Sequence, residues 1–278
     1  MEISLSELSE VKGIGKKTIQ RIREHKLADE GYISEYDEKL HLDRNSVNQG
    51  DCLELMNGIP NKSVDMILAD LPYGTTQNKW DSVIPLDKLW VQYERIIKKD
   101  GAIILTADGE FTFKLYNSNP KLFRYKLVWN KKLPTGFLNA NRMPLRQNED
   151  ILVFYKKLPT YNPQMRKGKY RNKGGATVNN GCYGDFEKQK YNYNDEYYPT
   201  SIIEIHNANQ SKKQHQTQKP IALFEYLIKT YTNKGDLVLD NVAGSGTTGV
   251  ACQNTDRDYI LIEQEQKYIN VIKERLES

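Results

Sequence analysis

The stretch that decides the fold runs from Leu237 to Gly249 and reads LVLDNVAGSGTTG. Its first three residues have the apolar character of a buried strand, and Asp240 closes that strand. Glycines then form the turn into a helix, where they allow a ligand to approach the backbone closely. The segment therefore predicts a nucleotide-binding unit in an α/β sheet.

The next strand supports this prediction. Residues 259–262 are apolar, and the run ends at Glu263, roughly 20 residues after Gly244. A Rossmann-like unit places a carboxylate at this distance to bind ribose hydroxyls, so we expect a cofactor that contains adenosine. The spacing of Gly244, Gly246 and Gly249 also matches the fingerprint of nicotinamide dinucleotide enzymes, and taken alone it leaves an oxidoreductase open.

Further apolar runs of strand length lie on both sides of the chain's middle and alternate with helical patterns, which predicts an α/β, doubly wound sheet. Seven strands are expected, the weakest just before Gly50. Helices are expected over residues 86–98 and 220–231. The other six strands are predicted at residues 64–69, 102–105, 126–129, 151–155, 237–239 and 259–262.

A second loop carries the chemistry. Asp70, Leu71, Pro72 and Tyr73 follow the predicted strand at residues 64–69, at the edge where α/β proteins bind ligands. The Asp70 carboxylate and the Leu71 carbonyl can each accept an N–H from an exocyclic amine. Pro72 would fix the turn, and Tyr73 could stack on a planar base. This combination predicts a site for a nucleobase amine.

These motifs together resemble one family, the β-class S-adenosylmethionine-dependent amino-methyltransferases of DNA, in which the catalytic motif precedes the cofactor loop. The resemblance covers about residues 47–275. The segments around Trp80 and residues 135–139 look like those of phage or prophage members. Three departures are Leu71 in place of a usual proline, Asn241-Val242 in place of Pro-Phe, and Gln216 in place of a proline. The matching segments are residues 50–55, 63–67, 70–74, 80–81, 148–154, 217–220, 235–240 and 243–249, with Tyr268.

The resemblance implies a Rossmann-like class I methyltransferase fold, with a seven-stranded mixed sheet and a circularly permuted motif order. It also implies roles for individual residues. Asp240 and the backbone from Gly244 to Gly246 would hold the methionine part of S-adenosylmethionine. Glu263 would bind its ribose and Asp51 its adenine edge. The cofactor set is completed by Lys219 and Thr247, the catalytic set is Asp70, Leu71, Pro72 and Tyr73, and no metal is expected.

The implied activity is site-specific transfer of a methyl group to the N6 amine of adenine in double-stranded DNA. Asp at position 70 favours adenine, whereas cytosine-N4 enzymes more often carry Ser there, so cytosine N4 is the nearest alternative. The departures at Leu71 and Val242 leave open a DNA-binding protein without catalysis. An oxidoreductase is disfavoured, because all four histidines fall outside the two loops.

Two segments outside this core are candidates for DNA binding. Residues 1–30 resemble a helix-hairpin-helix motif around Gly13 and Gly15, and the stretch 11–26 carries six Lys or Arg and one Glu. Residues 161–212 form a polar insertion in which basic residues alternate with seven tyrosines. Phosphate neutralisation and base stacking suit this composition, so a target-recognition role is expected. The alternative for residues 1–30 is a small helical pair without a DNA-binding role, and the alternative for residues 161–212 is a solvated loop.

The composition of the chain excludes some classes of protein and leaves others open. The 278 residues carry 40 Lys and Arg against 36 Asp and Glu, and this net charge of +4 is too small to indicate a polyanion partner by itself. No apolar run approaches the roughly 20 residues of a membrane span, and no signal peptide is expected. The widely spaced Cys52, Cys182 and Cys252 fit a reducing cytosol and argue against zinc. The family resemblance implies a location in a prokaryotic host cytosol or nucleoid. A homodimer and a cognate restriction endonuclease, as in restriction-modification, are left open.

Overall fold

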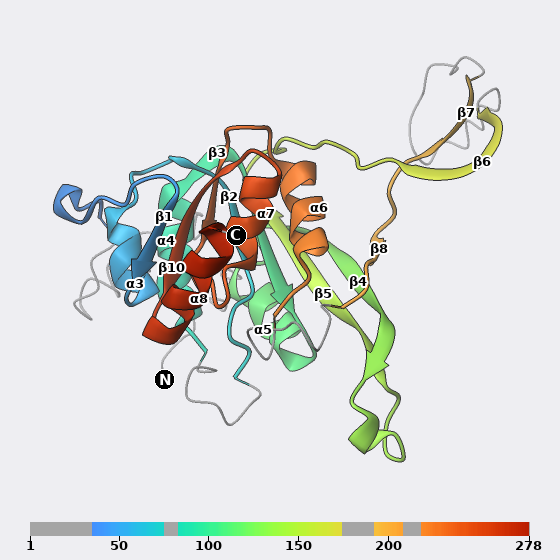
Figure 1. The fold of residues 1–278 in the computed structure, drawn as a ribbon, viewed down its shortest axis with the longest axis horizontal. Helices are drawn as coiled ribbons and strands as arrows, with labels where there is room; N and C mark the ends of the chain where they lie inside the picture. The colour runs from blue at the N-terminus through green and yellow to red at the C-terminus, as the bar shows by residue number, and fades with distance from the viewer. Residues whose placement is uncertain (1–34, 75–82, 174–191, 208–217, 278) are drawn as a thin grey trace, which may run out of the picture. The chain divides into compact units, whose positions relative to one another are not determined.

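The computed structural model describes residues 35–74, 83–173, 192–207 and 218–277. The chain divides into two compact units, a small one at Asn162–Thr200 and a large one on either side of it in sequence. The predicted helix-hairpin-helix at residues 1–30 lies outside the described residues, as do Cys182 and Gln216. The large unit holds the sheet and the site, and Figure 1 shows its strands side by side.

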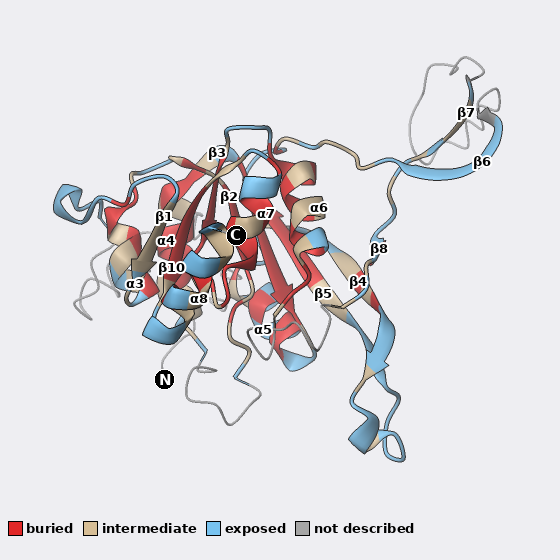
Figure 2. Ribbon diagram, in the orientation of Figure 1, coloured by how far each residue is buried: buried red, intermediate tan, exposed pale blue. Residues whose placement is uncertain are grey.

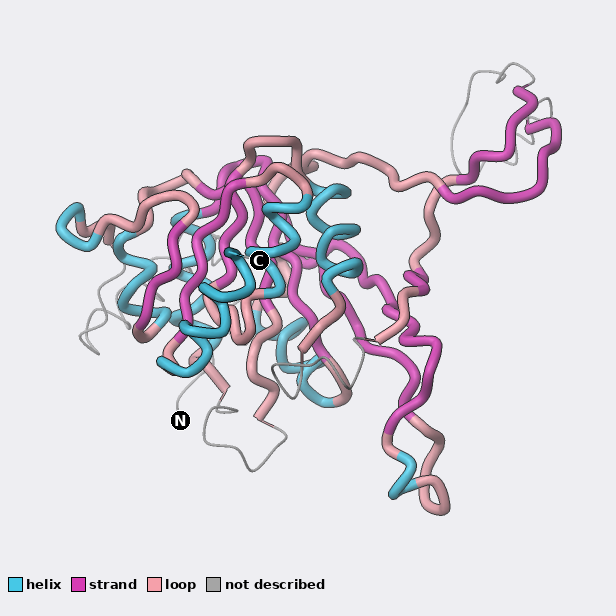
Figure 3. Tube along the Cα trace, viewed as in Figure 1, coloured by secondary structure: helices cyan, strands magenta, loops and turns pink. Residues whose placement is uncertain are grey.

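The large unit is built on an eight-stranded sheet with the order β1-β10-β9-β2-β3-β5-β4-β8 (Figures 1 and 3). All neighbouring pairs are parallel except those that β5 makes with β3 and β4. The strands are β1 (Ser46–Gln49), β2 (Val64–Ala69), β3 (Ile97–Ala107), β4 (Phe123–Thr135), β5 (Arg146–Tyr155), β8 (Ile202–Glu204), β9 (Leu237–Asp240) and β10 (Asp258–Glu263).

The predicted class of fold is confirmed, but the predicted count of seven strands is wrong. Each of the seven expected segments is a strand, and β8 is the eighth. It has only three residues, and only its central Ile203 is buried, so its sequence lacks the apolar run that marks the other strands. It pairs with β4 through Trp129 and Ile203, inside the range that the sequence assigned to the insertion.

Helices cover both faces of the sheet. Successive strand residues point to opposite faces, so Ile67 packs with α4 and α5 on one side and Met66 and Leu68 pack with α6 and α7 on the other. Figure 2 shows the buried strands between these two layers. No helix of the described residues has the length and hydropathy that crossing a membrane requires. The α-helices are α3 (Cys52–Leu55), α4 (Leu86–Ile96), α5 (Glu110–Ser118), α6 (Ile221–Tyr231), α7 (Thr247–Asn254) and α8 (Gln266–Glu277).

The direction of the strands positions the site. Because β1, β10, β9, β2 and β3 are parallel, their carboxyl ends share one edge of the sheet. Asp70 follows β2, Asp240 ends β9 and Glu263 ends β10 at this edge. Strand β4 is antiparallel to β5, which is itself antiparallel to β3, so β4 also runs toward this edge.

The small unit is a two-stranded antiparallel sheet of β6 (Arg166–Lys173) and β7 (Asn192–Tyr197). The rings of Tyr170 and Tyr193 stack with their centroids 6.4 Å apart, and the Arg171 guanidinium lies 4.9 Å from the Tyr197 ring centroid. This hairpin carries part of the basic and aromatic composition from which a recognition role was predicted, and that role stays a prediction.

Candidate active site

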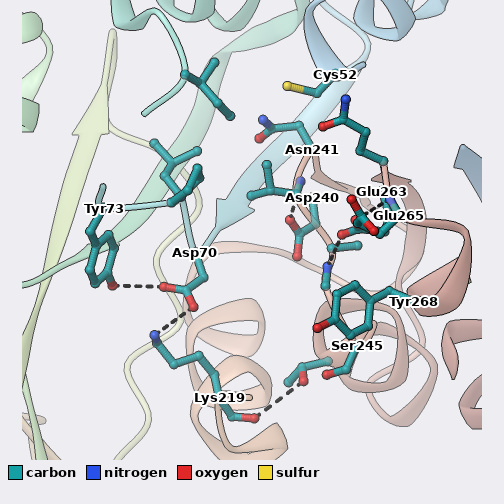
Figure 4. A pocket seen from close by; sticks show the side chains of 18 of the residues that line it. Cys52, Asp70, Tyr73, Lys219, Asp240, Asn241, Ser245, Glu263, Glu265 and Tyr268 are labelled. Carbon is teal, nitrogen blue, oxygen red and sulfur yellow. Dashed lines mark hydrogen bonds and ion pairs between the residues drawn. The ribbon is translucent and has the colours of Figure 1, made fainter. Parts of the chain in front are cut away.

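One cavity of about 460 Å³ lies at the carboxyl edge of the sheet and joins the two predicted loops. Figure 4 shows Asp70 and Lys219 on one side, Glu263 and Tyr268 on the other, and Asp240 between them. Of the eleven predicted site residues, ten line this cavity: Asp51, Asp70, Leu71, Pro72, Tyr73, Lys219, Asp240, Gly244, Thr247 and Glu263.

Gly246 is the predicted site residue that does not line the cavity, and it supports the site from behind. It precedes α7 with a φ of +77°, a left-handed conformation that favours glycine. A Cβ atom there would lie 2.9 Å from Cγ1 of Ile272 on α8. Because Gly246 has no side chain, α7 and α8 can pack closely behind the loop.

Glu263 is held by backbone N–H groups of the cofactor loop. Its Oε2 accepts a hydrogen bond of 2.8 Å from Gly244 N, and its Oε1 accepts one of 2.8 Å from Glu265 N. Burial raises the pKa of Glu263, and these backbone donors partly oppose the effect. Each oxygen of the Glu263 carboxylate can accept a further hydrogen bond. The carboxylate is therefore suited to bind the two hydroxyls of a diol at the mouth of the loop.

Asp240 lies at the base of the same loop and is 3% exposed. Its Oδ1 accepts a hydrogen bond of 3.1 Å from Val242 N, and its Oδ2 accepts one from the Thr248 hydroxyl. Burial raises the pKa of Asp240 to about 7, because the two donors only partly offset the loss of water and the nearby carboxylates of Asp70 and Glu263 add repulsion.

This elevated pKa predicts a pH dependence of stability. The folded-state pKa of about 7 exceeds the ordinary value of 3.8, so the stability associated with protonated Asp240 is full below about pH 3.8 and is lost as the pH rises through 7. Asp240→Asn removes this titration. We expect Asp240→Asn, compared with wild type, to have a clearly higher free energy of unfolding at pH 8 than at pH 5 in urea denaturation, because wild type alone loses stability over this range. A difference that is the same at both pH values would contradict the elevated pKa.

The departure from the family at Asn241 has a structural explanation. The Asn241 side chain is buried at 1% exposure, and its Oδ1 accepts a hydrogen bond of 2.6 Å from the Tyr93 hydroxyl on α4. Burial raises the pKa of Tyr93 well above its usual value, so the phenol remains a donor. Burial raises the pKa of the neighbouring Cys52 thiol to about 11, so the thiol stays protonated and has a packing role.

Asp51 caps the helix beside this cluster. Its Oδ1 accepts hydrogen bonds from Leu53 N at 2.8 Å and from Glu54 N at 3.3 Å. The carboxylate therefore has a structural role at the start of α3 and also lines the cavity. Its predicted contact with the adenine edge of the cofactor stays a prediction.

The Asp70 carboxylate is contacted by three side chains from three other positions in the sequence. The Tyr73 hydroxyl lies 2.9 Å from Oδ1, and the Thr106 hydroxyl also bonds to Oδ1. Lys219 Nζ donates to Oδ2 at 2.7 Å. These contacts fix the plane of the carboxylate at the cavity wall, and Figure 4 shows those from Tyr73 and Lys219.

Lys219 belongs to a chain of alternating charges. Its Nζ lies 3.1 Å from Oε2 of Glu149, whose Oε1 is 2.6 Å from Nζ of Lys131. Burial would lower the pKa of Lys219, but the attraction of the Asp70 and Glu149 carboxylates outweighs it and raises that pKa well above the usual value. Burial would likewise raise the pKa of Glu149, but Lys219 and Lys131 lower it. Two ammonium groups thus balance two carboxylates.

The turn after Asp70 is anchored by its other predicted residues. The Leu71 side chain is 2% exposed and belongs to the core, so an apolar side chain replaces the usual proline as the anchor. The Tyr73 ring stacks on Phe111 of α5, with centroids 5.1 Å apart and planes at 25°. Burial and the neighbouring Asp70 raise the pKa of Tyr73 well above its usual value, which keeps it a neutral donor. Stacking of Tyr73 on a base stays a prediction.

Three residues of this site were missed by the sequence reasoning: Thr106, Lys131 and Glu149. Thr106 directly follows a predicted strand, and its place at the same edge as Asp70 was a usable signal. Glu149 lies in the matched segment at residues 148–154, but nothing in the sequence pairs it with Lys131 or Lys219. In the described residues, no group of three or more His, Cys, Asp or Glu side chains is placed to hold a metal ion.

Comparison with known proteins identifies this arrangement. The family described as DNA methylase matches residues 64–274, well over half of the chain and both loops of the cavity. The chain belongs to the DNA methylase family. The predicted resemblance to the S-adenosylmethionine-dependent amino-methyltransferases of DNA is thereby confirmed. Similarity to phage members in particular stays a prediction.

Individual relatives of the methylase agree with this membership. It is 29% identical over 268 residues to Type II methyltransferase M.HinfI of Haemophilus influenzae, covering 84% of this chain and 68% of that protein. It is 28% identical over 246 residues to the DNA adenine methyltransferase YhdJ of Escherichia coli strain K12, covering 84% and 82%. The solved complex of M1.HpyAVI with SAM superposes with a TM-score of 0.59 at 22% identity, covering 84% and 99%.

Proposed function

We propose that this methylase transfers a methyl group from S-adenosylmethionine to the N6 amine of adenine at a specific sequence in double-stranded DNA. The observation that carries the proposal is the Asp70 carboxylate in one cavity with Asp240, Gly244 and Glu263. A carboxylate that accepts an amine N–H and a loop suited to adenosine are the two parts that this reaction requires. The printed name of the Escherichia coli relative, DNA adenine methyltransferase, supports adenine over cytosine.

Asp70 has the acceptor capacity that this role needs. A carboxylate offers about four lone-pair positions. Tyr73, Thr106 and Lys219 contact three of them. The remaining position can accept an N–H of the adenine amine. This contact would raise the electron density on the nitrogen, direct its lone pair along the line of transfer and stabilise the positive charge that develops there.

The cofactor supplies an electrophilic methyl group on a sulfonium sulfur, which leaves as a neutral thioether, and the methylated amine releases one proton to solvent. The protein therefore needs to orient the amine and stabilise its charge, and no protein nucleophile is required. Lys219 stays protonated because its pKa is raised, so it cannot act as a base. We assign it a positioning role: it neutralises and orients Asp70, instead of making the cofactor contact that the family resemblance implies.

On the cofactor side we propose that Glu263 binds the ribose hydroxyls. The loop from Gly244 to Thr247 and Asp240 would hold the methionine part, and Asp51 the adenine edge. Asp240 and Thr247 are buried behind this loop, at 3% and 5% exposure, so they would act mainly by fixing its shape. These assignments follow from position in one cavity and from the donors that each carboxylate already binds.

A substitution at Glu263 tests the cofactor side. Glu263→Gln places an amide N–H2 against a backbone N–H and removes an acceptor for the ribose. We expect the Kd for S-adenosylmethionine by calorimetry to rise about tenfold or more, which corresponds to about 1.4 kcal/mol. The single-turnover rate at saturating cofactor should stay within about threefold. Glu265→Gln, at a neighbouring cavity residue, is the control, and a rate loss without an affinity loss would contradict this assignment.

The proposed reaction is tested directly by its product. The full-length protein is incubated with unmethylated genomic DNA and S-adenosylmethionine, and the DNA is digested to nucleosides for mass spectrometry. N6-methyladenine is expected. Detection of N4-methylcytosine in its place would show that cytosine is the target base. Absence of both methylated bases would favour a DNA-binding protein without catalysis. Sequencing the same DNA with base-modification detection gives the recognition site.

Assembly and location are part of the same proposal. A site-specific DNA enzyme acts in the prokaryotic cytosol or nucleoid, where its substrate lies.

Residues 1–30 would bind phosphates, and the insertion with β6 and β7 would read the target sequence. A homodimer and a cognate restriction endonuclease remain open, and sedimentation of the full chain tests the first of them.

A further inference from the structure

Strands β4 and β5 continue past the sheet as an arm, defined here as residues 131–146 (Figures 1 and 3). Leu127 of β4 and Thr106 of β3 both pair with Ile151 of β5, which places Leu127 level with the carboxyl ends of the parallel strands. From there β4 runs eight residues further to Thr135, with a register irregularity between Asn130 and Thr135 where Lys132 adopts a φ of +65°. The arm thus leaves the sheet at the same edge as Asp70.

The outer part of the arm exposes apolar side chains. Phe137 is 76% exposed and Leu138 85% exposed, both in the 3₁₀ helix Phe137–Asn139 at the tip. Leu133 and Met143 on the two sides of the tip are 66% and 52% exposed. Large exposed apolar groups gathered on one projection are typical of an interaction site.

The tip is a formed loop with internal hydrogen bonds. Gly136 adopts a φ of +85°, which turns the chain after Thr135, and its carbonyl accepts from Asn139 N at 3.0 Å. The Asn139 carbonyl then accepts from Arg142 N at 2.8 Å and Met143 N at 3.0 Å. These backbone hydrogen bonds hold the loop at the tip, which carries the exposed apolar side chains.

The charge of the arm indicates which kind of partner it binds. Its residues include four basic side chains and no acidic one. Lys131 and Lys132 pair with Glu149 and Glu204 at the base of the arm. Arg142 makes no ion pair among the described residues, and Arg146 is 61% exposed with its guanidinium 3.4 Å from Asp108. Two guanidinium groups near an apolar tip suit a duplex, whose phosphates face outward and whose stacked bases are apolar.

We propose that the arm enters the DNA beside the target and inserts Phe137 and Leu138 into the base stack, occupying the space that the extruded adenine leaves. Arg142 and Arg146 would bind the adjacent phosphates. The inference rests on the proposed function, because an amine inside a duplex must leave the stack to reach Asp70. Apolar side chains inserted between base steps stabilise such an unstacked state.

The test separates base extrusion from chemistry. The double variant Phe137→Ser/Leu138→Ser is compared with wild type in single-turnover methylation, on two duplexes that carry the recognition site identified by the sequencing experiment. One duplex pairs the target adenine with thymine, and the other places it opposite an abasic position, where extrusion needs little help. Leu158→Ser is the matched control, since this leucine is also 76% exposed but lies outside the arm.

We expect the double variant to lose at least tenfold in rate on the paired duplex and less than twofold on the abasic duplex. The control should match wild type on both. Equal losses on the two duplexes, or no loss on either, would overturn the inference. A change in sedimentation from dimer to monomer in the variant would overturn it in favour of a second copy of this chain as the partner of the arm. Failure of wild type to methylate adenine on either duplex would instead count against the proposed function.

Discussion

Asp70→Ala is expected to lower the single-turnover rate of methyl transfer by about a thousandfold, the upper end of what removal of one charge-stabilising group costs. The Kd for S-adenosylmethionine should change less than about fivefold, because Asp70 contacts Tyr73, Thr106 and Lys219 and none of the loop residues that we assign to the cofactor. The rate is measured with excess enzyme on the recognition duplex, and the Kd by calorimetry.

Asp70→Asn is the conservative control for this prediction. Its amide oxygen can still accept an N–H from the amine, but the negative charge that opposes the developing positive charge is absent. We expect a rate between those of wild type and Asp70→Ala. Loss of rate and of cofactor affinity by equal factors in Asp70→Ala would contradict the proposed division between the two loops.

Lys219→Met is the second substitution with a large expected effect. It removes a buried ammonium group that lies 2.7 Å from Asp70 and 3.1 Å from Glu149, and it leaves two carboxylates with Lys131 as the remaining cation of the chain. Breaking a buried ion pair from one side typically costs about 3–5 kcal/mol. We expect a lower free energy of unfolding in urea and a rate of methyl transfer reduced about a hundredfold, comparable to the loss of one electrostatic contact.

Lys131→Met is the matched control, because Lys131 is also buried and pairs with the other oxygen of Glu149 without contacting Asp70. It should reduce stability similarly and the rate much less. The positioning role also predicts that the Kd for S-adenosylmethionine stays within about threefold in Lys219→Met. A large loss of cofactor affinity with an unchanged rate at saturation would support the original interpretation of Lys219 as a cofactor contact.

The sequence predicted the sheet well where strands are buried on both faces. Continuous apolar runs such as residues 66–69 and 259–262 are typical of strands that are buried on both faces. It underestimated β4 and β5, because residues 131–135 and 146–150 lack the continuous apolar run of a buried strand. It missed β8 because pairing with β4, and not its own composition, makes those three residues a strand.

The site was predictable to the extent that it lies at strand ends. Asp70, Asp240 and Glu263 each follow an apolar run directly, and parallel strands bring such positions to one edge. The partners of Asp70 come from β3 and from the segment before α6, and those of Lys219 include β5. Which of these strands are neighbours is a property of the topology, and the order β2-β3-β5-β4 cannot be read from local patterns. The chain of alternating charges through Glu149 could therefore not be predicted from the sequence.

A structure of the protein bound to a cofactor analogue and its recognition duplex tests the central claim most directly, through the distance from Asp70 to the target base. The account predicts an adenine rotated out of the duplex, with its N6 within about 3.2 Å of an Asp70 carboxylate oxygen, as a hydrogen bond requires. An adenine that stays stacked, or one whose amine lies out of hydrogen-bond reach of Asp70 while the analogue fills the Gly244 loop, would contradict it.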